Sequence, residues 1–206
     1  MSTVATLIPD DVFEHIGRNA GIILSDFDTT TKTVDKSKII GATSGGVNFT
    51  DTPTYTDFGE DIDNCPKNTK ELKELDSREV KISGTYVSMT IEQNTDLIGA
   101  ADYDAKTGKI TIRDEVTVDD FKTIWFIFDY GNGGVIAIKI NNALSTGGFA
   151  VQTTEKAKAT YAFEYTAHYG IEDSTKPYEI YYIANTATAA AALADDEEDT
   201  EGTVAN

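Results

Sequence analysis

Residues 158–170 read KATYAFEYTAHYG, and along them apolar and polar side chains alternate. The odd-numbered positions carry the apolar set, which consists of Ala159, Tyr161, Phe163, Tyr165, Ala167 and Tyr169. The even-numbered positions include Glu164 and His168. Because successive side chains of a β-strand point to opposite faces, this period of two predicts a strand with one apolar and one polar face.

The same period recurs in residues 78–92, REVKISGTYVSMTIE. Val80 and Ile82 follow one phase, the apolar residues from Val87 onward follow the other, and the change falls near Gly84. A glycine inside a strand pattern often marks a bulge or a bend, so the stretch predicts one long, bent strand. Shorter strand candidates cover residues 20–24, 134–140, 149–153 and 178–183.

Residues 117–134, TVDDFKTIWFIFDYGNGG, follow a different spacing. Their apolar side chains recur at helical intervals, at Phe121, Ile124, Trp125 and Phe128. Thr117 suits an N-cap and the glycines after Tyr130 suit a helix end, so a packed helix from Asp119 to Asp129 is expected. A weaker helix is expected over 69–75 and a short helical turn after Thr95. The predicted fold class is mainly β, with one flanking α-helix.

Residues 45–66, GGVNFTDTPTYTDFGEDIDNCP, resemble neither a core strand nor a simple loop. Four residues carry apolar surface, and they are Val47, Phe49, Tyr55 and Phe58. The stretch also contains acids and no base, the acids being Asp51, Asp57, Glu60, Asp61 and Asp63. We predict a long acidic connection over about 41–77 whose apolar residues are buried only against a neighbouring copy of the chain. The alternative is a long loop that folds on its own domain.

Composition limits the remaining possibilities. The chain has 206 residues and a formal charge of −18, which argues against a surface that grips nucleic acid or an anionic membrane. We expect one domain over residues 1–184 and a disordered acidic tail over 185–206. Cys65 is the only cysteine, which excludes an internal disulfide framework and suits a reducing cytoplasm. The sequence shows neither a signal peptide nor an apolar run of membrane-spanning length.

Catalytic and metal-binding patterns are weak. His15 and His168 are the only histidines, and neither accompanies a nucleophile motif, so we expect no enzyme activity and no cofactor. Residues 102–115, DYDAKTGKITIRDE, place glycine and glutamate outside EF-hand spacing and favour a hairpin turn at Thr107-Gly108. The carboxylates of residues 57–64 leave a calcium site open as an alternative.

Four stretches, taken in order, resemble one protein family. They are GGVNFT at 45–50, TYTDFGEDIDNCPKNTKELKELDSREVKISGTYV at 54–87, DDFKTIWFIFDYG at 119–131, and TYAFEYTAHYGIEDSTKPYEIYYI at 160–183. Their order is similar to that of the major tail tube proteins of long-tailed bacteriophages and related prophages. The resemblance spans roughly Asp10 to Ile183 and excludes the acidic tail.

This resemblance implies a structural virion protein with a β-sandwich or barrel-like fold, homohexameric rings, and rings stacked into a hollow tail tube. Other copies, the tape measure, distal tail and terminator proteins would be its partners, and DNA would pass through without specific binding. An acidic bore would repel DNA and let it slide, with Glu164, Glu79 and Glu92 as candidate lining residues. Such a protein is made in the bacterial host cytoplasm. The alternative is a non-catalytic β-sandwich binding module, such as an adhesin or a carbohydrate-binding decoration.

Overall fold

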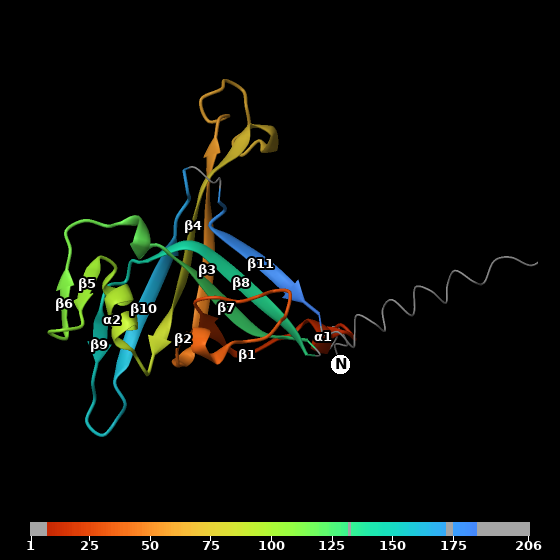
Figure 1. The fold of residues 1–206 in the computed structure, drawn as a ribbon. Helices are drawn as coiled ribbons and strands as arrows, with labels where there is room; N and C mark the ends of the chain where they lie inside the picture. The colour runs from red at the N-terminus through yellow and green to blue at the C-terminus, as the bar shows by residue number, and fades with distance from the viewer. Residues whose placement is uncertain (1–7, 132, 172–174, 185–206) are drawn as a thin grey trace, which may run out of the picture.

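The computed structural model describes residues 8–131, 133–171 and 175–184, so the predicted tail at 185–206 lies outside the described residues. The protein is mainly β, as expected, with a nine-stranded antiparallel sheet and a separate two-stranded hairpin (Figure 1). The strands are β1 Gly17–Leu24, β2 Ile39–Gly41, β3 Thr43–Asp57, β4 Lys73–Tyr86, β5 Ala101–Asp104, β6 Lys109–Ile112, β7 Lys122–Tyr130, β8 Gly134–Ser145, β9 Ala150–Gln152, β10 Thr160–Ala167 and β11 Tyr178–Ile183. The helices are α1 Val12–His15 and α2 Ile91–Ile98, with short 3-10 turns η2 Lys36–Lys38, η3 Lys70–Leu72 and η4 Val118–Asp120.

The large sheet divides at β8. Along one edge, β8 pairs with β11 over residues 135–140 and with β10 over residues 143–145. One part of the sheet therefore runs β2-β1-β7-β8-β11, and the other contains β9, β10, β4 and β3. The sheet is not closed, because β2 and β3 stand at the two ends of the strand order in the described residues.

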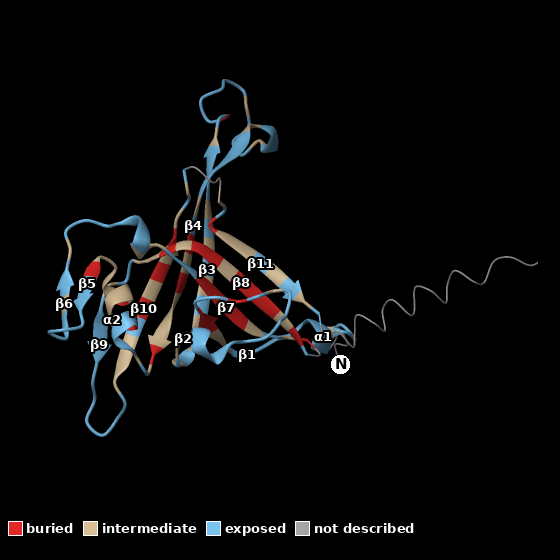
Figure 2. Cartoon of the chain, viewed as in Figure 1, coloured by how far each residue is buried: buried red, intermediate tan, exposed pale blue. Residues whose placement is uncertain are grey.

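The main core joins the two parts of the sheet. Ile23, Phe126 and Ile138 from the first part lie in one buried cluster with Ile82 and Phe163 from the second. At the rim of this cluster, Phe49 of β3 meets Tyr178 of β11 edge-to-face, with ring centroids 5.3 Å apart. Figure 2 shows the buried residues concentrated where β4, β7, β8 and β10 come together.

The predicted helix from Asp119 to Asp129 is wrong. Only the 3-10 turn η4 forms there, with Thr117 as its capping residue, and the chain then continues as strand β7. Ile124 faces the main core, whereas Trp125 faces a second cluster on the opposite side of the sheet. A strand buried on both faces is apolar at nearly every position, so helical spacing is met by coincidence.

The other two residues assigned to the predicted helix, Phe121 and Phe128, have different surroundings. Phe128 is partly buried against the main core, and Phe121 precedes β7 and packs edge-on against His168, with ring centroids 5.2 Å apart. The one α-helix longer than a single turn among the described residues is α2. Thr90 and Gln93 form its capping box, and it ends at Gly99, whose φ is 89°.

The expected long loop over 41–77 is also wrong for most of its length. Residues 43–57 form β3, and the weaker helix predicted over 69–75 is a 3-10 turn that leads into β4. Strand β4 stops at Tyr86, so the change of phase after Gly84 marks the end of a strand rather than a bend within it. The irregularity lies on the partner strand, where Gly45 and Gly46 adopt positive φ opposite this segment.

The other strand predictions are confirmed, with shifted ends. Strand β10, Thr160–Ala167, forms within residues 158–170, and Phe163, Tyr165 and Ala167 are buried as the alternation requires. The hairpin expected within residues 102–115 is β5–β6, and its turn contains Gly108 at φ 68°. Shorter strands form at all the remaining predicted places.

Candidate functional site

A projecting arm, defined as residues 51–79, is the most distinctive surface feature (Figure 1). β3 and β4 pair with each other from Asp57–Lys73 down to the core, but β10 pairs with β4 only over residues 81–86. The outer half of the β3–β4 hairpin therefore has no further strand beside it in the described part of the chain. Figure 2 shows this arm as mostly exposed.

The four apolar candidates of this segment separate into two pairs. Val47 and Phe49 lie near the base and pack against the main core of their own chain. Tyr55 and Phe58 lie near the tip, and their exposed fractions are 51% and 59%. Ile62 and Leu75 are also exposed at this end of the arm. The prediction that these side chains are buried only against a neighbouring copy is therefore wrong for Val47 and Phe49, whereas the tip keeps an exposed apolar surface.

Backbone hydrogen bonds to one carboxylate organise the tip. Asp57 accepts from the N–H of Gly59 at 2.9 Å and from the N–H of Asn68 at 2.8 Å. These hydrogen bonds favour the charged form and lower the pKa of Asp57. Because both oxygens of Asp57 are engaged in this way, the carboxylate is committed to holding the loop.

A polar cluster fastens the base of the arm to β11. Asp51 accepts hydrogen bonds from Arg78 of β4 and from the hydroxyl of Tyr178, the latter at 2.8 Å. The bond to Asp51 raises the pKa of Tyr178. Since Phe49 also contacts the Tyr178 ring, one residue of β11 holds the base of the arm through both polar and apolar contacts.

The predicted bore-lining acids are brought together only in part. Glu79 and Lys81 of β4 form an ion pair at 2.6 Å, and Lys81 lies 4.0 Å from Glu164 of β10. The hydrogen bond to Glu79 raises the pKa of Lys81. These residues share the outer face of the second part of the sheet, because the alternate residues of β4, Val80 and Ile82, are buried.

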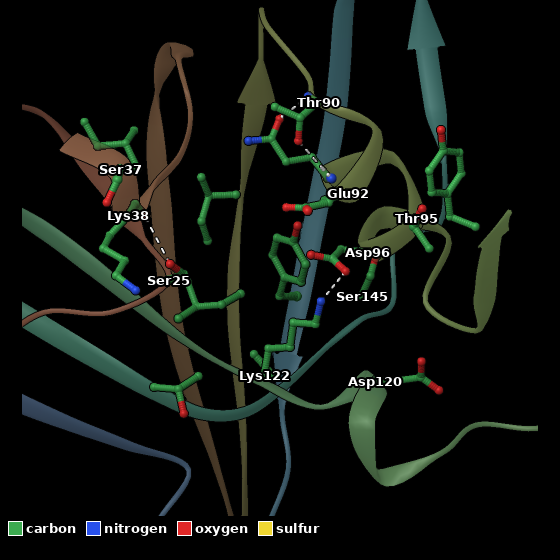
Figure 3. Close-up of a pocket in the computed structure, with 18 residues that line it drawn as sticks. Ser25, Ser37, Lys38, Thr90, Glu92, Thr95, Asp96, Asp120, Lys122 and Ser145 are labelled. Atoms are coloured by element: carbon green, nitrogen blue, oxygen red, sulfur yellow. Dashed lines mark hydrogen bonds and ion pairs between the residues drawn. The ribbon is translucent and has the colours of Figure 1, made fainter. Parts of the chain in front are cut away.

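Glu92 lies elsewhere, in the first turn of α2, at the wall of a pocket of about 720 Å³. Figure 3 shows Ser37 and Lys38 on one side of this pocket and Thr90, Glu92 and Thr95 on the other. Asp96 and Lys122, which also line the pocket, form an ion pair with each other. Sequence reasoning missed this pocket, because its walls come from segments far apart in the chain that no motif connects.

The floor of the pocket is less polar than its rim. Ile40, Ile124 and Tyr165 contribute to it, and burial raises the pKa of Tyr165. The Tyr165 ring packs against Phe163, with ring centroids 5.8 Å apart, so the pocket has a partly apolar base.

The two histidines have separate partners. His15 lies 2.9 Å from the hydroxyl of Tyr130 and 3.0 Å from Asp11, and His168 contacts Phe121. Within residues 8–131, 133–171 and 175–184, no cluster of His, Cys, Asp and Glu is suited to a metal ion. No helix in the same residues is long and apolar enough to span a membrane.

No known family model matches the sequence, and a search of curated proteins also finds no match. The arm, the open sheet and the pocket are therefore the features of the molecule that bear on its function.

Proposed function

We propose that this protein is a structural subunit that assembles with copies of itself into rings, and that the rings stack into a hollow tube. In this proposal it serves as the tail tube protein of a long-tailed bacteriophage, through which DNA passes. The two parts of its sheet act as a β-sandwich, and edges left open in one copy are covered by the next.

The observation that carries the proposal is the arm. It extends a two-stranded hairpin away from the core and presents exposed Tyr55, Phe58 and Ile62 near its end. Apolar side chains at the end of a protrusion cannot be covered by their own domain, and a surface of this kind is typical of an interaction site. A partner is therefore expected at the tip.

Open strand edges support a partner of the same kind. β3 pairs with β4 on one side, and the described residues place no strand on its other side along Thr43–Asp57. Exposed strand edges invite pairing with another chain, and closure into a ring removes them. A homomeric ring would cover such an edge in every subunit.

The outer face of β4 and β10 suits a water-filled bore. Its residues are small, polar or charged, including Lys81, Ser83, Glu164 and Thr166. Two acids and one base leave a small negative charge there, so DNA would find no cluster of cations to bind. The face is thus less acidic than the whole-chain charge suggests.

Negative-stain electron microscopy of the concentrated protein tests the proposal. Rings or hollow tubes are the expected result, either spontaneously or after addition of a tail initiator complex. Monomers at every concentration and salt level, with the initiator present, would contradict it.

A non-catalytic binding module is the second candidate, because the 720 Å³ pocket has the size of a small-ligand site. It predicts dispersed monomers in the same micrographs. Saturable binding of a soluble saccharide, lost when Lys122 is replaced by Ala, would favour this candidate over self-assembly.

A further inference from the structure

The pocket and the tip of the arm lie at opposite ends of one hairpin. β2, which supplies Ile39 and Ile40 to the pocket, directly precedes β3, and Thr90 to Asp96 follow shortly after β4. Between these points, β4 runs from Lys73 at the arm to Tyr86 near the pocket. At a rise of about 3.3 Å per residue, the two features are separated by about 45 Å.

The tip of the arm and the pocket both present apolar side chains. Tyr55, Phe58 and Ile62 are exposed near the tip, and each aromatic ring can bury about 150–250 Å². The pocket offers Ile39, Ile40 and Ile124 within about 720 Å³. Its volume lies within the range of about 300–1,000 Å³ that is typical of binding pockets.

Charge is also complementary on one wall of the pocket. Asp61 and Asp63 of the tip form no ion pair in the described residues, and the same is true of Lys38 on the η2 side of the pocket. On the opposite wall, Asp96 is paired with Lys122 and Asp120 with Arg113, so most of the acids there are already neutralised. Lys38 is thus available to meet an acidic segment.

We propose that the tip of the β3–β4 hairpin of one copy docks into the pocket between η2 and α2 of the next copy. Tyr55 and Phe58 contact the apolar floor, and Asp61 and Asp63 face Lys38. This inference rests on the proposed self-assembly and identifies its head-to-tail contact. A contact between two different surfaces repeats without limit, and this one sets an axial repeat of at most about 50 Å from the length of the hairpin.

Site-directed cross-linking tests the docking directly. In a Cys65→Ser background, Asp61→Cys on the tip is combined with Ser37→Cys on the pocket rim, and assembled protein is treated with a short bismaleimide. A ladder of covalent multimers is expected. Asp61→Cys combined with Lys158→Cys is the matched control and should give no ladder, because Lys158 is exposed and away from the pocket.

Charge reversal gives an independent test. Lys38→Glu should raise the concentration needed for assembly at least about tenfold, whereas Lys158→Glu, with the same change of charge, should not. Adding Asp61→Lys and Asp63→Lys to Lys38→Glu should restore assembly. Unchanged thermal unfolding of the monomer shows that each variant folds.

The outcomes separate the two proposals. If wild-type protein assembles, but the Asp61→Cys and Ser37→Cys pair gives no ladder and Lys38→Glu assembles normally, the docking site is wrong and the proposed function stands. If wild-type protein does not assemble under any condition, both are overturned.

Discussion

At the scale of single residues, burial and hydrogen bonding decide which side chains serve the fold and which remain for a partner. Trp125 and Phe58 illustrate the difference. Trp125 is 6% exposed between Phe27 and Tyr181, whereas Phe58 is 59% exposed. The sequence marks both as large aromatic residues, and only the structure separates their roles.

Trp125→Ala should lower the free energy of unfolding by about 3–5 kcal/mol, because it leaves a cavity against Phe27 and Ala137. Chemical denaturation with matched slopes measures the loss. Phe58→Ala, an aromatic deletion at an exposed site, is the control and should change stability by less than about 0.5 kcal/mol. A loss below about 1 kcal/mol for Trp125→Ala would contradict the packing described here.

Asp57→Ala should loosen the tip without unfolding the domain, because the N–H groups of Gly59 and Asn68 lose their acceptor. The pKa of Asp57 is lowered in the fold, so its contribution is present above the unfolded value of about 3.9 and is lost as the pH falls through the folded pKa. Hydrogen exchange should therefore show faster exchange of these amides in the variant. Wild-type protein should approach the same rates only in acid, below that folded pKa.

At the scale of elements, the sequence predicts strands well where one face is solvated and poorly where both faces are covered. β10 shows clear alternation because Glu164 and Thr166 lie on an open face. β7 lacks alternation because the segment around Phe27 covers its second face. The sequence of β7 itself contains no pattern that predicts this contact. β3 was not predicted for another reason: Pro53, two glycines and two aspartates are rare in central strands but acceptable on an exposed edge.

The apolar residues at the base and at the tip of the β3–β4 hairpin should differ in their effect on stability and assembly. Tyr55→Ser with Phe58→Ser should leave the monomer folded and abolish assembly, because these side chains contribute little to their own core. Phe49→Ser should instead lower monomer stability by about 2–4 kcal/mol, since it removes a core contact and the Tyr178 ring pair. Calorimetry and light scattering distinguish the two effects. Equal loss of stability in both variants would show that the tip also belongs to the core.

At the scale of the whole molecule, the charge of −18 is unevenly distributed. The arm, residues 51–79, has nine acids and four bases, whereas the outer face of β4 and β10 pairs Lys81 with two glutamates. Composition predicts an acidic protein but not where the acids gather. In the proposed tube, the net charge of the bore is therefore determined largely by Glu79, Lys81 and Glu164.

Glu79→Lys combined with Glu164→Lys should convert that face to a cationic one without blocking assembly, because both side chains lie outside the core. Tubes of the double variant should bind duplex DNA, with an affinity that falls steeply as salt rises. Wild-type tubes are the control and should bind none. Equal DNA binding by both would mean that this face does not line the bore.

The pairing of distant strands also determines the order in which the chain can fold. β3 and β4 are neighbours in the chain, joined by residues 58–72, whereas β1 cannot pair until the distant β7 is available, since Ile23 lies opposite Phe126. Local hairpins close faster than long loops, so we expect the arm to form early and the first strand to wait. The pocket needs β7, β8 and β10 and is completed last, so the tip of the arm can form before the pocket that is proposed to bind it.

Pulse-labelled hydrogen exchange during refolding tests this order. Amides of residues 49–56 should be protected before those of residues 22–24, and the reverse order would contradict the expected folding sequence.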